Sequence, residues 1–369
     1  MMKRILVIGG YGNFGQFISK ALAQEPDIQL IIAGRSLGKA QACCSRIEAI
    51  NQPVALAMNI YSDLAASLRN AAPDIVIHTS GPFQDQGYQV AEACIEIGSH
   101  YMDLADGRTF VAGITSLQQA AAEKGLLICS GASSVPGLSS ALIQHYQPHF
   151  HSITEVDYAI STAHNTSRGL ATTRAVLSYA GKPFAALRNG RSTNVIGWRG
   201  TRSKQFWKLG NRLLGNCDIP DLALFPSHFP DLETIRFQAG LELPFIHHAL
   251  ATLAWLVQHR LCPDLPAFAP AMMALSRLFD AFGTEDSGFF MELIGQDAKK
   301  NPKKVRFDLI ARQGDGLYIP TIPAIVVALK LARNQITQTG ACACLGLVTL
   351  EEYLERLKPL HIEWQELIT

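Results

Sequence analysis

The stretch from Ile5 to Gly15 constrains the fold of this chain more than any other. It opens with an unbroken, mostly β-branched apolar run, which is typical of a buried parallel strand. Glycines follow at the spacing Gly10-x-Gly12-x-x-Gly15, and the residues after them have the apolar periodicity of a helix. A strand, a glycine turn and a helix in this order form the dinucleotide-binding fingerprint. We therefore predict a Rossmann-type nucleotide site at the start of the chain.

Each glycine of the fingerprint has its own physical task. Gly10 permits the tight turn, Gly12 lets the backbone approach a pyrophosphate, and Gly15 lets the helix lie against the strand. The helix amino terminus adds free N–H groups and the positive end of the helix dipole. A tight turn without a ligand is the alternative interpretation. We expect the following loop residues to contact the cofactor: Gly10, Tyr11, Gly12, Asn13, Phe14 and Gly15.

The residues after the second predicted strand, 29–33, bear on which nicotinamide cofactor binds. An NAD site has Asp or Glu there to hydrogen-bond the ribose hydroxyls. This chain has Arg35 and Ser36 instead, with Lys39 one helical turn later. A guanidinium and a hydroxyl suit the 2′-phosphate of NADP, so we predict NADP(H) as the preferred cofactor and NAD(H) as the second choice. The competing interpretation is that Arg35 is only a solvated loop residue.

Repeated strands and helices through residue 129 predict a doubly wound parallel sheet of the α/β class. Ligands of such sheets lie outside the carboxyl ends of the strands. The ends of the third and fourth predicted strands, 54–58 and 74–78, therefore supply further cofactor contacts. These candidates are Asn59, near the adenine, and the small-residue loop Ser80, Gly81, Pro82 and Phe83.

The fifth predicted strand, 100–104, carries the candidates for catalytic proton transfer, which are Tyr101, Asp103 and Asp106. Side chains alternate along a strand, so Tyr101 and Asp103 share one face, which is either the cleft or the helix-packed face. A buried carboxylate beside the nicotinamide can have its pKa raised toward neutrality and act as an acid or a base. The alternative is that Asp103 only fixes the next turn.

Length and composition limit the remaining possibilities. A chain of 369 residues with a formal charge of +1 is expected to form a soluble protein of about two domains. We predict a Rossmann domain over 1–150, an inserted α+β substrate and dimerisation domain over 151–317, and a segment over 318–369 that returns to the first domain. We expect no secretory signal, membrane span, disulfide framework or metal site, and so a cytoplasmic protein with reduced thiols.

The segment from Tyr158 to Cys217 contains no Asp or Glu, and Trp198, Phe206 and Trp207 are interleaved with its basic residues. Such segregation would create a local positive field. A carboxylate-binding wall of a substrate cleft, a patch for anionic lipid and a solvated face balanced by acids elsewhere are the three interpretations. The pI of 7.6 argues against nucleic acid. The basic residues are Arg168, Arg174, Lys182, Arg188, Arg191, Arg199, Arg202, Lys204, Lys208 and Arg212.

Several further segments are informative together: Ala91 to Leu104, Ser134-Val135-Pro136-Gly137, Gly314-Asp315-Gly316, 319–324 and 340–346. With the glycine turn and Ser80-Gly81-Pro82-Phe83, they resemble the saccharopine dehydrogenase superfamily. The resemblance implies a nucleotide domain with an inserted α/β substrate domain, and hydride transfer with NADP(H) or NAD(H) at a C–N bond of a small amino-acid-derived or anionic substrate. By motif position it implies that Ala105, Asp106 and the turn 131–136 face the nicotinamide and the substrate.

One departure from this family concerns the substrate. Saccharopine reductases tend to have an acidic residue in the turn after the sixth strand, where this chain has Ser133 and Ser134. We take these serines and Arg174 as substrate-binding candidates. The alternatives to this function are a polyamine-type or enoyl-reductase-type member of the superfamily, and a non-catalytic NADP-binding protein at a membrane surface. The apolar helices predicted at 247–261 and 270–282 suggest a homodimer.

Overall fold

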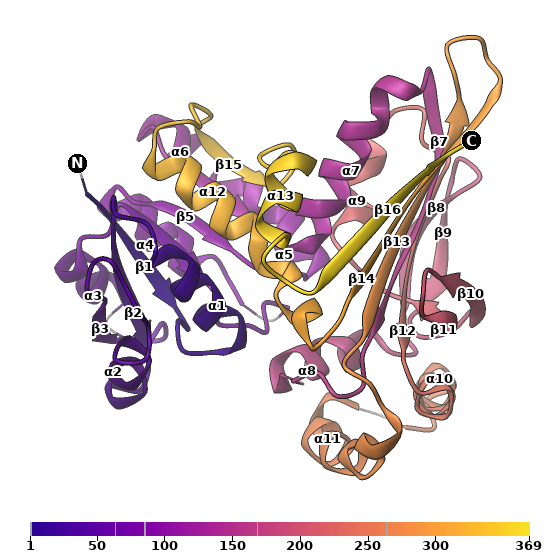
Figure 1. The fold of residues 1–369 in the computed structure, drawn as a ribbon, viewed down its shortest axis with the longest axis horizontal. Helices are drawn as coiled ribbons and strands as arrows, with labels where there is room; N and C mark the ends of the chain where they lie inside the picture. Colours follow the sequence, from indigo (N-terminus) through magenta and orange to yellow (C-terminus); the bar gives the residue numbers. More distant parts are fainter. Residues whose placement is uncertain (1, 63, 85, 168, 263–264) are drawn as a thin grey trace. The chain divides into compact units, whose positions relative to one another are not determined.

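The computed structural model describes residues 2–62, 64–84, 86–167, 169–262 and 265–369 (Figure 1). The chain divides into two compact units, each with its own seven-stranded sheet. The first unit comprises Met1–Ala141 and Tyr318–Arg356, and the second comprises Leu142–Leu317 and Leu357–Thr369.

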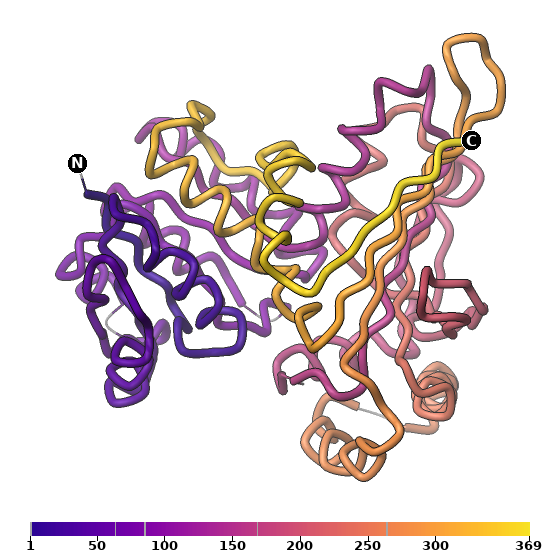
Figure 2. Tube along the Cα trace, in the orientation of Figure 1, coloured from indigo at the N-terminus to yellow at the C-terminus, as the bar shows by residue number. Residues whose placement is uncertain are grey.

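The last strand, β16 (Ile362–Ile368), makes this division differ from the domains expected from the sequence. It pairs antiparallel with β14 (Pro302–Ala311) from Ala311↔Ile362 to Val305↔Ile368, and the two strands run side by side in Figure 2. The segment that follows Tyr318 therefore contributes to the first unit only as far as Arg356. The earlier boundary falls inside helix α7 (Ser139–Tyr146).

The first unit is built on a parallel sheet with the strand order β15-β6-β5-β4-β1-β2-β3. The chain winds outward from β1 to β2 and β3, then crosses to β4 on the other side. The predicted doubly wound Rossmann-type fold is confirmed, and its switch point lies between β1 and β4, where such sheets bind ligands. The bounds are β1 (Lys3–Ile8), β2 (Ile28–Gly34), β3 (Val54–Ala57), β4 (Ile75–His78), β5 (His100–Asp103), β6 (Leu127–Ser130) and β15 (Gly340–Ala343).

Helices cover both faces of this sheet. One apolar cluster joins Leu6, Val76 and Tyr101 to α4 and its neighbours. Helix α12 packs against α1 and β4, and almost all of its residues are buried. The helices are α1 (Asn13–Leu22), α2 (Leu37–Cys44), α3 (Leu64–Ala71), α4 (Gln89–Ile97), α5 (Arg108–Gly113), α6 (Gln118–Glu123), α12 (Ile322–Ala332) and α13 (Leu350–Leu357).

One stretch of the described residues, Asp315–Ala332, meets the length and hydropathy criteria of a membrane span, with a mean hydropathy of 1.4. Of this stretch 61% is buried inside the protein. An apolar helix that packs in a protein core passes the same criteria, and the burial of α12 is of that kind.

The second unit has the strand order β10-β11-β12-β7-β13-β14-β16. Its strands are antiparallel except for the pair β12 and β7. One face is apolar, through residues such as Tyr158 and Phe307, and the other carries charged residues such as Asp157 and Glu292. The remaining elements are β7 (Ser152–Thr162), α8 (Leu170–Tyr179), β8 (Pro183–Arg188), β9 (Arg191–Ile196), β10 (Arg202–Phe206), β11 (Gly210–Asn216), α9 (Asp221–His228), β12 (Thr234–Leu241), α10 (Pro244–Gln258), α11 (Ala269–Ser276) and β13 (Ser287–Gln296).

The charged face neutralises much of the acid-free segment 158–217. Arg202 donates to Asp157 at 2.8 Å, Lys204 donates to Glu292 at 3.0 Å, and Lys208 donates to Glu363 at 2.5 Å. Strands β7, β13 and β16 thus supply the acids that the segment lacks, which is the third of the interpretations given above.

Two of the three aromatic side chains that the lipid interpretation invokes are buried, so they are not available to enter a membrane surface, and contact with a membrane stays a prediction. Trp198 is 2% exposed and Phe206 is 1% exposed. Arg168 lies outside the described residues.

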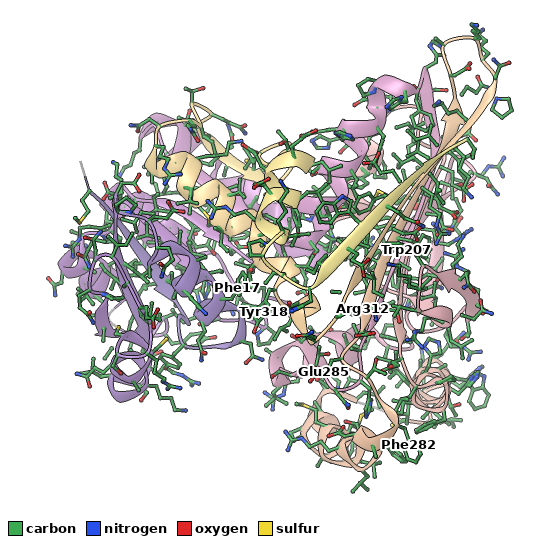
Figure 3. All side chains as sticks on the ribbon, viewed as in Figure 1. Phe17, Trp207, Phe282, Glu285, Arg312 and Tyr318 are labelled. Atoms are coloured by element: carbon green, nitrogen blue, oxygen red, sulfur yellow. The ribbon has the colours of Figure 1, made fainter. Side chains whose placement is uncertain are left out.

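Helices α10 and α11 expose part of their apolar surface. Phe245, Trp255 and Leu275 are among the exposed side chains, as is Phe282, which is labelled in Figure 3. Helix α10 begins at Pro244 and helix α11 begins at Ala269, close to the starts at 247 and 270 that the sequence predicts. The homodimer expected from them stays a prediction.

Candidate cofactor and proton-transfer site

The fingerprint turn begins where β1 ends. Backbone N–H groups of Gly9 and Gly10 donate to the carbonyl oxygen of Ala33 at 2.8 and 3.2 Å, and Gly12 donates to Gly9 at 2.8 Å. A Cβ atom at Gly15 would lie 2.2 Å from the carbonyl oxygen of Gly9. Helix α1 can therefore leave the turn at this angle only with glycine at position 15, which is the close approach that the sequence predicts.

The amino terminus of α1 is open to a ligand. Gly12 is the N-cap residue, and no side chain caps the helix. A Cβ atom at Gly12 would meet only the Gly9 oxygen within 4 Å, at 3.2 Å. Asn13 is exposed and Phe14 is half-buried beside it. An uncapped helix end at an exposed glycine is suited to bind a pyrophosphate.

Tyr11 connects the fingerprint turn to the end of β2. Its hydroxyl accepts a hydrogen bond from the backbone N–H of Ser36 at 3.1 Å. Its ring packs against Gly34, where a Cβ atom would lie 2.5 Å from Tyr11 Cε1. The side chain of Tyr11 thereby fixes the turn that presents Arg35.

Two cations and a hydroxyl gather at the start of α2. Arg35 and Lys39 are exposed, and neither side chain has an ion-pair or hydrogen-bond partner among the described residues. Ser36 caps the helix, with Oγ accepting from the N–H of Lys39 at 3.4 Å. This donor set is chemically suited to a phosphate, and no carboxylate is present in it to bind free ribose hydroxyls.

The loop after β4 packs directly on the fingerprint turn. Gly9 has a φ of 79°, and a Cβ atom there would lie 2.6 Å from Ser80 Oγ. The side-chain amide of Gln86 holds the loop by donating to the carbonyl oxygens of Ser80 and Pro82 at 2.9 and 2.7 Å. The structure thus brings these two predicted cofactor loops together.

Two of the predicted cofactor residues have structural contacts of their own. Phe83 is 4% exposed, and its ring contacts His78 and Phe110 with centroid distances of 5.1 and 5.4 Å. Phe83 therefore anchors its loop in the core, and its ring is not at the surface. Asn59 is exposed at the end of β3, where its Oδ1 accepts from the N–H of Tyr61 at 3.1 Å.

Tyr101 and Asp103 lie on the helix-packed face of the sheet. Tyr101 is 1% exposed and belongs to the apolar cluster with residues of α4, and Asp103 is 0% exposed. Asp103 Oδ1 accepts hydrogen bonds from Ala105 N at 2.9 Å, Ser130 Oγ at 3.0 Å and Gly131 N at 2.9 Å. These contacts match the alternative stated for Asp103, because they fix the turn after β5 and join it to the turn after β6.

A buried histidine that the sequence analysis missed adjoins this pair. His78 is 1% exposed, and its Nδ1 lies 3.3 Å from the hydroxyl of Tyr101. Burial lowers the pKa of His78 to about 3, so the ring is neutral at physiological pH. Burial raises the pKa of Asp103 to about 6, although the hydrogen bonds from Gly131, Ala105 and Ser130 oppose the shift. The only indication of this buried histidine in the sequence is that a polar residue ends the apolar strand β4.

Replacing Asp103 by Asn is expected to change how stability depends on pH. The native carboxyl, with a pKa of about 6 against an ordinary 3.8, keeps its proton where the unfolded chain has lost it. Its contribution to the free energy of unfolding is therefore complete below about pH 4 and is lost as the pH rises through about 6, an effect of about 3 kcal/mol. Urea unfolding of wild type and Asp103→Asn at several pH values measures this pH dependence of the free energy of unfolding. A difference between wild type and Asp103→Asn that is constant with pH would contradict it.

Asp106 is the accessible member of the three catalytic candidates. Its side chain is exposed, and Oδ1 accepts a hydrogen bond from the amide of Gln84 at 3.0 Å. This bond joins the loop after β4 to the loop after β5 at the carboxyl edge of the sheet. Asp106 is therefore accessible at this strand end, whereas Tyr101 and Asp103 are buried.

The predicted substrate residues belong to different units. Ser133 is 8% exposed and Ser134 is half-buried in the first unit, where Ser134 hydrogen-bonds the hydroxyl of Tyr353. Arg174 is exposed on α8 in the second unit. Its side chain has no ion-pair partner among the described residues.

An aromatic stack that the sequence did not predict ties the C-terminal segment to the fingerprint helix. The rings of Phe17 and Tyr318 lie parallel within 13°, with centroids 4.2 Å apart (Figure 3). Tyr353 extends the attachment by donating to the carbonyl oxygen of Ile319. The segment from Tyr318 thus supports the helix whose amino terminus faces the predicted pyrophosphate.

Comparison with known proteins shows what this geometry resembles. Residues 5–129 match the family described as the saccharopine dehydrogenase NADP binding domain. Among solved structures, the apo form of saccharopine dehydrogenase (L-Glu forming) from Saccharomyces cerevisiae has a TM-score of 0.69 and 11% identity, over 99% of this chain and 100% of that chain. Residues 5–129 are therefore similar to this NADP binding domain, and the chain shares the fold of the solved saccharopine dehydrogenase. This similarity supports an oxidoreductase with a nicotinamide cofactor.

Two other solved structures match this chain with lower TM-scores. GenD2 from gentamicin A biosynthesis, in complex with NAD, has a TM-score of 0.40 and 13% identity over 82% of this chain and 72% of that chain. Amine dehydrogenase from Mycobacterium smegmatis has a TM-score of 0.39 and 13% identity over 65% of this chain and 78% of that chain. No curated protein sequence gives a match.

Proposed function

We propose that this protein is an NADP(H)-dependent oxidoreductase that transfers hydride at a C–N bond of a small, anionic, amino-acid-derived substrate. The observation that carries the cofactor preference is the donor set at the end of β2. Arg35 and Lys39 have no protein partner among the described residues, and Ser36 stands beside them at the start of a helix. These groups suit a 2′-phosphate, which NADP has and NAD lacks.

The chain supplies the orienting contacts for such a cofactor, whose nicotinamide carries the hydride when bound. The open amino terminus of α1 at Gly12 would hold the pyrophosphate, and the loop from Ser80 to Pro82 would border it. Tyr11 keeps Arg35 and Ser36 in place through its bond to the Ser36 backbone. The bond from Gln84 to Asp106 fixes the adjoining rim.

The candidate substrate residues are considered within each unit by itself. In the second unit, Arg174 is exposed and unpaired among the described residues, and its guanidinium is suited to bind a carboxylate through two parallel hydrogen bonds. Asp106 is the proposed proton partner because Tyr101 and Asp103 are buried on the helix-packed face. The C–N bond is proposed from the resemblance to saccharopine dehydrogenases.

The test of this function has two stages. Calorimetric titration of the purified protein with NADPH and with NADH measures the preference. NADPH consumption is then followed with mixtures of a 2-oxo acid and an amine donor, and product formation is checked by mass spectrometry. We expect tighter binding of NADPH and consumption only when both partners are present. Absence of NADPH binding at millimolar concentration would overturn the proposal.

Replacing Asp106 by Asn is expected to lower turnover by about 100-fold or more, since general acid–base catalysis contributes on that scale. The NADPH dissociation constant should be unchanged, because the predicted cofactor contacts lie in other loops. The assay is the NADPH consumption described above. Equal turnover in variant and wild type would remove Asp106 as the proton partner.

A further inference from the structure

Three cysteines meet at one edge of the first sheet. Cys129 lies on β6, and Cys342 and Cys344 lie on or directly after the edge strand β15. The two strands are parallel, with Cys342 as the register partner of Cys129. Residues in register on neighbouring strands point to the same face. Accordingly, the neighbouring thiols of Cys342 and Cys344, together with burial, raise the pKa of Cys129.

The three thiols differ in their access to solvent. Cys129 is 0% exposed and Cys344 is 1% exposed, whereas Cys342 is partly exposed on the edge strand. The amide of Gln338 donates to Cys342 Sγ at 3.4 Å. The hydrogen bond from Cys129 lowers the pKa of Cys342 and correspondingly raises that of Cys129. Cys342 is therefore the reachable thiol, and the one that more readily ionises.

The arrangement favours thiol chemistry over metal binding. Within the described part of the chain, no group of three or more His, Cys, Asp or Glu side chains is placed to hold a metal ion. Neighbouring strands lie about 4.8 Å apart, which is within the Cα separation of about 4.4 to 6.8 Å that a disulfide requires. All eight cysteines are in the free form.

We propose that Cys342 and Cys129 form a peroxide-sensitive thiol pair that closes to a disulfide. The thiolate of Cys342 attacks hydrogen peroxide, so that an S–O bond forms, the O–O bond breaks and hydroxide leaves as water after protonation. The product is a sulfenic acid at Cys342. The sulfur of Cys129 then attacks it, forming the S–S bond, breaking the S–O bond and releasing a second water that carries the Cys129 proton. Two thiols are oxidised and one peroxide is reduced to two waters.

The pair is positioned to influence the candidate site. The residue after Cys129 is Ser130, whose hydroxyl donates to Asp103 and whose carbonyl oxygen accepts from Cys344 N at 2.9 Å. A bridge between Cys129 and Cys342 therefore acts on the strand end that holds the turns after β5 and β6. We expect oxidation to weaken NADPH binding severalfold. The thiol chemistry itself does not depend on the proposed function.

Peptide mapping of the full-length protein tests the pair directly. The protein is treated with hydrogen peroxide, alkylated without reductant, digested and analysed by mass spectrometry. We expect a disulfide that joins the peptides of Cys129 and Cys342, with the loss of the mass of two hydrogen atoms, reversed by dithiothreitol. A disulfide between Cys342 and Cys344 instead, or no disulfide, would overturn the proposal.

Two cysteine variants distinguish the thiol that reacts with peroxide from the thiol that then forms the disulfide. Cys129→Ser should leave the sulfenic acid at Cys342 to be trapped by dimedone, and Cys342→Ser should abolish both trapping and the disulfide.

Cys262, which is also partly exposed but lies in the second unit, is the matched control for the reactivity of Cys342. We expect alkylation of Cys342 to be at least about tenfold faster than that of Cys262, because of its lowered pKa. Equal alkylation rates for Cys342 and Cys262 would contradict the proposed reactivity of Cys342. The wild-type mapping and rate measurements need no variant, so poor folding of Cys129→Ser leaves the proposal testable.

Discussion

Replacing Arg35 by Ala is expected to weaken NADPH binding by about 30- to 100-fold and to leave NADH binding nearly unchanged. A charge-assisted hydrogen bond to phosphate contributes about 2 to 3 kcal/mol, and 1.4 kcal/mol corresponds to a tenfold change in affinity. The effect is selective because only NADP carries the 2′-phosphate. Arg35 is exposed, so its removal should leave the free energy of unfolding unchanged.

The matched control for this variant is Arg46→Ala. Arg46 is an exposed arginine just beyond the other end of α2, where its Nε donates to the carbonyl oxygen of Ala42 at 2.9 Å. Its removal should alter the affinity for neither cofactor. Calorimetric titrations of both variants with NADPH and NADH make the comparison. Equal losses for the two cofactors in Arg35→Ala would show that Arg35 does not bind the 2′-phosphate.

Replacing Gly15 by Ala is expected to abolish the binding of both cofactors and to lower the free energy of unfolding by about 3 kcal/mol or more. The added Cβ would lie 2.2 Å from the Gly9 carbonyl oxygen and 2.7 Å from Gly10 Cα. Both neighbours are backbone atoms, so no side-chain movement relieves the contact. Helix α1 would have to move away from the turn, and its N–H groups would move with it.

A second glycine provides the control for Gly15→Ala. Gly38 lies in the first turn of α2, where a Cβ atom would meet no other atom within 4 Å. Gly38→Ala should therefore raise the free energy of unfolding by about 0.4 to 1 kcal/mol, because alanine lowers the conformational entropy of the unfolded chain. Urea unfolding of both variants measures these opposite effects. A Gly15→Ala protein as stable as the wild type would show that the close packing of α1 on its turn is not needed.

The Rossmann half of the fold could be predicted because its signals are local. Strand β1 is an unbroken apolar run, and α4 ends at Gly98, whose φ of 79° is the left-handed cap that glycine favours. Strand β15 lacked such a signal. It is four residues long, and it is a strand only because it pairs with β6 more than two hundred positions earlier in the chain.

The charge pattern of the second unit shows the same limit. The segment 158–217 is basic when read along the chain, but Asp157 and Glu292 reach its cations across the sheet. Register between distant strands decides those pairs, and a local composition count contains no information about register.

The candidate site was predictable to the level of strand ends and loops. The fingerprint, Arg35 and Ser80 occupy the edge that the sequence indicates. Alternation along β5 predicted that Tyr101 and Asp103 share a face, but it could not say which face, because that depends on where α4 packs. The partnership of His78 with Tyr101 is likewise set by the neighbouring strand.

One carboxylate oxygen, Asp103 Oδ1, accepts hydrogen bonds both from Ala105 on its own side and from Ser130 and Gly131 on the other. The two loops are thereby mechanically coupled, and neither can be displaced without breaking a bond at a group sealed from water. A displacement of one loop is therefore transmitted to the other through this single shared atom, without any movement of a whole domain.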